Sequence, residues 1–176
     1  AGNPYFISLE DLIEEKLLTR EECESCDWGG SESYVDYEKM YMSRYKLLRK
    51  AYERSDFLKD KDYEIFLKEE KNWLTDYCLF MAIKNSQKGI CWIDWPDELK
   101  DRHSKAVKEA EKELETEINF YRFQQYCFTT QWRKLKKYAN KKGISIIGDV
   151  PIYVALDSSD AWANPEMLQF DKDHNP

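Results

Sequence analysis

The feature that most constrains this chain is a short apolar segment, Ile144-Ser-Ile-Ile-Gly-Asp149, placed directly after a long stretch with helical periodicity. Its isoleucines favour an extended strand, and Gly143 is the kind of residue at which a helix ends. Helix, glycine and apolar strand in that order predict the second half of a strand–helix–strand unit. Such a strand is normally covered on both faces, so we expect its partner strands elsewhere in a longer polypeptide.

Apolar residues recur at intervals of three and four along most of the remaining sequence, which is typical of amphipathic helices. Ser8 and Thr19 have the sequence context of helix N-caps, and Glu22 stands three residues after Thr19, as in a capping box. The stretch 104–142 fits either one long helix or two helices with a break near 108–113. Its aromatic part, Phe120 to Trp132, should be buried. The expected helices cover residues 9–17, 20–25, 36–52, 60–70, 72–86 and 104–142.

The overall composition disfavours several classes of protein. Lys and Arg number 27 against 34 Asp and Glu, a net charge of −7, whereas nucleic-acid binding depends on clustered positive charge. No apolar run approaches the roughly 20 residues that a membrane-spanning helix needs. Aromatic residues make up 15% of the chain. Rings can stack on sugars, but core packing explains most of them equally well.

The five cysteines and two histidines form no recognisable metal site. Cys23-Glu-Ser-Cys26 has the spacing of half a zinc site, but structural zinc needs four ligands and the histidines are not a spaced pair. A redox motif of this spacing should open the helix of a thioredoxin-like unit, and no strand precedes it. We therefore expect no metal and no cofactor. Scattered cysteines and a start without signal-peptide character indicate a reduced, cytoplasmic protein.

A carboxylate, Asp149, stands where the predicted strand stops. Ligands of parallel α/β structures bind at the carboxyl ends of the strands, so Asp149 can be a site residue. Five polar side chains follow between Asp157 and Asn164, and Tyr153 and Trp162 could be platforms for sugar rings. A structural loop whose Asp and Ser residues cap helices explains the same composition. The residues alone leave both interpretations open.

One stretch is distinctive: Ile146-Ile-Gly-Asp-Val-Pro-Ile-Tyr-Val-Ala155, followed by Asp157-Ser-Ser-Asp-Ala-Trp-Ala-Asn-Pro165. It closely resembles the 4-α-glucanotransferases of glycoside hydrolase family 77, the amylomaltases or disproportionating enzymes. The resemblance runs from residue 2 to the end. Three further stretches match in the same order: Gly2-Asn-Pro-Tyr-Phe-Ile-Ser-Leu9, Trp73-Leu-Thr-Asp-Tyr-Cys-Leu-Phe-Met-Ala82, and Phe120 to Trp132 with Gln131-Trp132-Arg133.

This resemblance implies a TIM (β/α)8-barrel enzyme of the α-amylase clan that transfers α-1,4-glucan segments between maltooligosaccharides. The fold class would be α/β, mostly helical in this part of the barrel. Residues 1–100 would form a helical insertion subdomain. Residues 101–176 would supply a long helix, barrel strand three and the following active-site loop, so that the chain is an internal piece of the enzyme.

The resemblance also implies site residues. Asp149 would support the sugar bound at the −1 subsite without taking part in the chemistry, and Tyr41 aligns with a family tyrosine suspected of glucan contact. Tyr153, as a possible platform for a sugar ring, is the third expected substrate contact. Retaining transfer needs two carboxyl groups about 5–5.5 Å apart, and the family carries them on later strands. We therefore expect no catalytic residue in this chain and no activity from it alone.

Two other classes of function stay open on the sequence. One is a non-catalytic helical interaction module, and the other is a weak maltooligosaccharide-binding module. A strand without its neighbours also exposes apolar surface, which could drive self-association of the chain.

Overall fold

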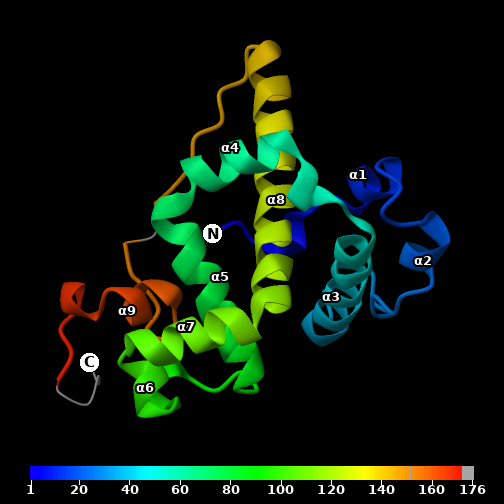
Figure 1. Cartoon of the computed structure of the whole chain (residues 1–176). Coiled ribbons are helices and arrows are strands. Elements are labelled where there is room, and N and C mark those ends of the chain that lie inside the picture. Colours follow the sequence, from blue (N-terminus) through cyan, green and yellow to red (C-terminus); the bar gives the residue numbers. More distant parts are fainter. Residues whose placement is uncertain (151, 172–176) are drawn as a thin grey trace. The chain divides into compact units, whose positions relative to one another are not determined.

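The computed structural model describes residues 1–150 and 152–171, which form helices joined by loops (Figure 1). No described residue lies in a β-strand. No helix of the described part has both the length and the apolar character to cross a membrane. The α-helices are α1 (Leu9–Glu14), α2 (Arg20–Glu24), α3 (Tyr37–Arg54), α4 (Lys61–Glu69), α5 (Lys71–Ser86), α6 (Asp97–Lys100), α7 (Ser104–Glu113), α8 (Glu115–Lys141) and α9 (Ser159–Ala163). Short 3-10 turns are η1 (Pro4–Phe6), η2 (Phe57–Lys59), η3 (Trp92–Asp94) and η4 (Pro165–Met167).

The helix starts predicted from the capping patterns are confirmed. The Ser8 hydroxyl accepts a hydrogen bond from the Asp11 backbone N–H at 3.1 Å. Thr19 and Glu22 form the reciprocal capping box, with each side chain bonded to the backbone N–H of the other residue. Gly143, at φ +76°, stands just past α8 in the left-handed conformation that glycine adopts without strain.

The stretch 104–142 forms two helices, the second of the alternatives that its sequence allowed. The break is at Leu114, one residue beyond the expected interval, where the backbone has φ −102° and ψ 17°. Phe120 and Phe123 are buried as expected, but burial does not extend to Trp132, whose ring is exposed. The apolar face of α8 is therefore only partly covered.

The chain divides into two compact units. Unit 1 contains Ala1–Phe66 and Phe123–Ile146, and unit 2 contains Leu67–Arg122 and the chain from Ile147 onward. Helices α4 and α8 each contribute residues to both units.

The core of unit 1 combines leucines of the first and third helices with a group of aromatic rings. Leu12, Leu47 and Leu48 are completely or almost completely buried. Phe57 and Phe123 meet edge to face, with ring centroids 5.4 Å apart, a favoured geometry for aromatic pairs. The other rings in contact with this pair are Tyr52, Tyr63 and Tyr126.

Two glutamines of α8 hold the N-terminal segment of unit 1. The Gln125 amide accepts from the Gly2 N–H at 2.7 Å and donates to the Gly2 carbonyl at 2.9 Å. Gln131 makes the same pair of hydrogen bonds with Ser8, at 2.6 and 3.2 Å. Gly2 packs so closely on Phe128 that a Cβ there would lie 2.1 Å from the ring. The side chains of α8 thus supply hydrogen-bond partners to a segment whose only regular structure is the 3-10 turn η1.

Glu22 joins α2 to α3. Its carboxylate accepts two hydrogen bonds from Arg54, at 2.7 and 2.8 Å, and one from Lys50 at 3.0 Å. These hydrogen bonds hold the pKa of Glu22 well below its usual value. The bonds from Arg54 have the largest effect, followed by those from Lys50 and from the Thr19 backbone N–H. The charged form of Glu22 is therefore the one that the folded chain stabilises.

In unit 2, α5 packs against α7 and α9, and Figure 1 shows α9 beside α5.

The strand expected over residues 144–149 does not form in this structure. Residues 144–150 have no regular secondary structure and all are exposed. A parallel strand is stabilised by backbone hydrogen bonds to its neighbours and by cover on its faces. The described part of the chain contains no other strand to supply them, so a strand-like sequence stays without a sheet.

We predict that Gln125→Ala destabilises the protein by about 2–4 kcal/mol, because it leaves the N–H and C=O of Gly2 without partners. Urea unfolding followed by circular dichroism measures the change. Lys136→Ala, on an exposed position of the same helix, is the control and should change stability by less than about 0.5 kcal/mol. Equal stability of the two variants would contradict the role given to Gln125.

We also predict a pH dependence of stability that runs through Glu22. A carboxyl group whose folded pKa is lowered stabilises the protein above its unfolded pKa, and this contribution is lost as pH falls below it. On lowering the pH from 7 to 3, wild type should therefore lose more stability than Glu22→Gln. Urea midpoints at each pH test this, and parallel curves for the two proteins would refute it.

Candidate functional site

The structure does not bring the three predicted site residues together within one unit. Asp149 and Tyr153 lie in unit 2, whereas Tyr41 lies on α3 in unit 1. Asp149 is exposed, and its carboxylate accepts a hydrogen bond from the adjacent Val150 N–H at 2.8 Å. The Tyr153 side chain is 86% exposed. In this structure, therefore, the segment around Asp149 is an open surface.

The chain becomes anchored again directly after this open segment. The Trp92 indole donates to the Leu156 carbonyl at 2.7 Å. The next residue, Asp157, forms an ion pair with Lys84 of α5. Both contacts lie within unit 2 and fix the point at which the segment 143–155 ends.

Trp162 is the centre of this anchor. It is completely buried, and its indole donates to the Leu99 carbonyl at 3.0 Å. The Arg102 guanidinium lies 4.1 Å from the centre of its ring and also donates to Asp76 at 2.6 Å. Phe80 and Trp95 contact Trp162 as well. The expectation that Trp162 offers a platform to a sugar is therefore wrong, because core residues cover the ring.

The polar side chains after Leu156 have structural roles. The Ser158 hydroxyl caps α9 by accepting from the Ala161 N–H at 3.2 Å. Asp160 lies in the first turn of this helix, where a negative charge is favourable. Together with the ion pair of Asp157, these contacts support the helix-capping interpretation that the sequence left open.

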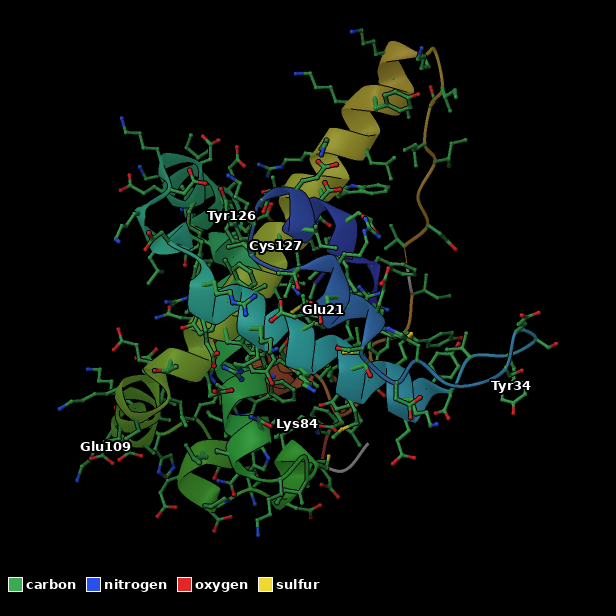
Figure 2. All side chains as sticks on the ribbon, turned by 90° about the vertical axis from the view of Figure 1, so that its right-hand side faces the viewer. Glu21, Tyr34, Lys84, Glu109, Tyr126 and Cys127 are labelled. Carbon is green, nitrogen blue, oxygen red and sulfur yellow. The ribbon has the colours of Figure 1, made fainter. Side chains whose placement is uncertain are left out.

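A row of tyrosines on α3 forms the second surface of interest. Tyr37, Tyr41 and Tyr45 follow one another at intervals of four, which places them on one face of the helix. Tyr37 is 68% and Tyr41 46% exposed, and the rings of Tyr41 and Tyr45 are 4.5 Å apart. Tyr34 stands at the outer end of the preceding loop, 74% exposed (Figure 2). We call these four residues the tyrosine face.

Only Tyr41 of this face was predicted, although the repeated spacing of four was visible in the sequence. Burial, and then the nearby Tyr41 and Tyr5, raise the pKa of Tyr45 to about 12. Burial and Tyr41 raise the pKa of Tyr5 as well. The hydroxyls of Tyr5 and Tyr45 are therefore protonated at neutral pH. A protonated phenol can donate and accept hydrogen bonds beside an apolar ring, which matches the chemistry of a sugar.

Unit 1 also carries an apolar groove of about 720 Å³. Its polar edge is the ion pair between Asp11 and Lys134, at 2.9 Å. The hydrogen bond from Lys134 lowers the pKa of Asp11. Because the two sides of the groove lie more than a hundred residues apart, helical periodicity alone did not predict it. The lining residues are Phe6, Ser8, Asp11, Phe128, Gln131, Trp132, Lys134, Leu135 and Tyr138.

We predict that substitution of the two aromatic residues considered as sugar platforms changes the stability of the protein by very different amounts. Trp162→Ala should cost about 3–5 kcal/mol, as for other large buried side chains, since it also removes the bond to Leu99. Tyr153→Ala should change stability by less than about 0.5 kcal/mol. Urea unfolding tests both, and Trp162→Phe separates the indole hydrogen bond from ring packing. A small effect of Trp162→Ala would contradict the anchor.

Comparison with known proteins gives one consistent family. The family model described as 4-alpha-glucanotransferase matches residues 1–174. A 4-alpha-glucanotransferase of Clostridium butyricum is 42% identical over 173 residues, which is 98% of this chain and 36% of that protein. The relative from Aquifex aeolicus is 39% identical over 176 residues, or 100% and 35% of the two chains. The chain thus spans about a third of the length of these curated relatives.

The structural comparison agrees. The structure of amylomaltase from Streptococcus agalactiae in complex with acarbose matches this chain with a TM-score of 0.92 and 36% sequence identity. The match covers 100% of this chain and 36% of that one. Because the family model covers almost the whole sequence, the chain belongs to the 4-alpha-glucanotransferase family.

Proposed function

We propose that this chain works as part of a retaining enzyme that transfers α-1,4-glucan segments between maltooligosaccharides. The observation that carries the proposal is the family match over residues 1–174. The amylomaltase neighbour was solved with acarbose, a bound ligand that supports an oligosaccharide as the substrate class.

In this proposal the chain belongs to a TIM barrel. Residues 1–100 form the helical insertion, and residues 101–176 supply a barrel helix, the third strand and the loop after it. A barrel helix must turn an apolar face toward the strands. The end of α8 has such a face, since Trp132, Leu135 and Tyr138 are all exposed. Isoleucines after α8, among them Ile144 and Ile147, are exposed. Such β-branched residues are typical of a barrel strand, which neighbouring strands and helices would cover.

The proposed substrate contacts are Asp149, Tyr153 and Tyr41. Asp149 would stand at the carboxyl end of the third strand, the edge at which barrel enzymes bind substrate. Its exposure supports this role, because no described contact ties it to the core. Tyr41 would meet a glucan on the tyrosine face, where exposed phenol rings can stack on sugars.

We propose that the catalytic carboxylates lie outside these 176 residues. A retaining mechanism needs one carboxyl group as nucleophile and a second as acid and then base. Two acidic residues of the loop after Asp149 already have other roles, since Asp157 pairs with Lys84 and Asp160 lies in the first turn of α9. The chain alone would then bind glucan at most and transfer none.

A second candidate is a weak maltooligosaccharide-binding module without catalysis. The exposed tyrosine face favours it, because it lies in a single unit and needs no further polypeptide. Titration with maltoheptaose separates this candidate from a helical interaction module, for which no saturable change in fluorescence is expected.

The five thiols of the chain are all free, two of them buried. A reducing compartment such as the cytoplasm keeps thiols in this form. We therefore place the enzyme there in our proposal.

The proposal predicts that this chain can replace the matching segment of a relative. A chimera of the Clostridium butyricum protein that carries these 176 residues should convert maltotriose into glucose and longer maltodextrins. The 176-residue chain alone should not. In the chimera, Asp149→Asn should lower the rate by about 10²-fold or more, a loss typical of a residue that positions the reacting sugar.

Asp62→Asn is the matched control, because Asp62 is an exposed aspartate of α4 in the insertion. It should leave the rate of the chimera unchanged. Chromatography of the maltodextrin products measures all four proteins. Transfer by the isolated chain, or an unchanged rate for Asp149→Asn, would contradict the proposal.

A further inference from the structure

Two cysteines stand together at the end of α2. Cys23 lies in the last turn of the helix, and Cys26 follows after Ser25, whose backbone is still helical at φ −76° and ψ −7°. Residues three apart in a helix have Cα atoms about 5 Å apart. Disulfides join Cα atoms roughly 4.4–6.8 Å apart. The backbone therefore already has the spacing that a bond between the two sulfurs requires.

The two thiols differ from the buried cysteines of the chain. Cys23 and Cys26 are partly exposed, whereas Cys78 and Cys127 are buried in the two cores. Cys91 is also partly exposed but belongs to unit 2 and has no cysteine near it in sequence. A small oxidant can therefore reach a pair of thiols only at the end of α2, among the cysteines of the chain.

The two thiols also affect each other electrostatically. Burial raises the pKa of Cys23, and the negative charge of an ionised Cys26 is the next largest cause. The Cys26 thiol donates to the Glu22 carbonyl at 3.4 Å, on the preceding turn of α2. A raised pKa means that the thiolate of Cys23 is not stabilised. Cys23 thus lacks the thiolate stabilisation that makes other dithiols strong oxidants in their disulfide form.

Cys23 and the residues near it also hold the loop of residues 26–36, which leads to the tyrosine face. The Trp28 indole donates to the Cys23 carbonyl at 2.8 Å, and the Arg44 guanidinium lies 5.8 Å from the Trp28 ring. Ser43 of α3 donates to the Asp27 carbonyl at 2.7 Å. A new bond at Cys26 would act directly on this loop, which carries Tyr34 at its outer end (Figure 2).

We propose that Cys23 and Cys26 form a reversible disulfide that fixes the loop of residues 26–36 against the end of α2. The oxidant is a low-molecular-weight disulfide such as oxidised glutathione. One cysteine thiolate attacks it and releases one glutathione, and the second cysteine thiolate then displaces the other glutathione. Two cysteine thiols are oxidised, and one glutathione disulfide is reduced to two thiols. An effect on glucan binding through Tyr34 and Tyr41 rests on the proposed function, whereas the disulfide itself does not.

The experiment equilibrates the protein in glutathione buffers from fully reduced to fully oxidised, alkylates the remaining thiols and digests with trypsin. Arg20 and Lys39 flank a single peptide, residues 21–39, that contains both cysteines. In oxidised buffer this peptide should be unalkylated and lighter by two hydrogens than its reduced form, and dithiothreitol should reverse the change. Cys91→Ser should behave like wild type, and Cys23→Ser and Cys26→Ser should show no internal disulfide.

A second readout follows the loop. Oxidation should change the tryptophan fluorescence of wild type, and Trp28→Phe should abolish this change. Two free thiols in peptide 21–39 at the most oxidising buffer, or separate glutathione adducts without an internal bond, would overturn the disulfide. A disulfide without a change at Trp28 would overturn its action on the loop. The mass measurement involves no sugar. Its result is therefore independent of whether the chimera transfers glucan, and the two proposals can fail separately.

Discussion

Unit 1 depends on the two side-chain amides that α8 offers to a segment with almost no regular structure. Gln125 pairs with the N–H and C=O of Gly2, and Gln131 pairs with those of Ser8, whose carbonyl also accepts from the Leu12 N–H. This explains why a helix surface can organise a chain that has no hydrogen-bond ladder of its own. It also sets the position of Ser8, from which α1 begins, and of Asp11, whose ion pair with Lys134 closes one edge of the groove.

The features that the sequence predicted well are those that depend on interactions between residues close together in the chain. The capping box at Thr19, the glycine after α8 and the helical spacing of α3 and α5 all depend on neighbours in the chain. The prediction of a strand over 144–149 was wrong because a strand depends on hydrogen bonds to segments that are distant in sequence. The same limit applies to the candidate site. The capping role of Ser158 could be predicted from composition, but the burial of Trp162 depends on Leu99 and Arg102, which lie some sixty residues earlier.

The distinctive motif of residues 146–165 consists of two parts: one whose side chains are exposed to solvent, and one whose side chains are held by contacts within the protein. From Asp157 onward, the chain is fixed by the ion pair with Lys84 of α5, by the Ser158 cap of α9 and by the buried Trp162, which contacts Phe80 of α5. Before Leu156, the described residues offer their side chains to solvent. In the proposed enzyme, the fixed part would hold one end of the loop while the barrel supplies the position of the other. Residues that resemble a family motif most closely thus need not all contact its substrate.

Helices α4 and α8 each belong to both compact units, and this has a consequence for how the molecule comes apart. If one unit were to lose its structure, the part of α4 or α8 left in the other unit would end without the turns that continue it, and short helices are marginal by themselves. Continuous helices, and not loops alone, therefore connect the two units.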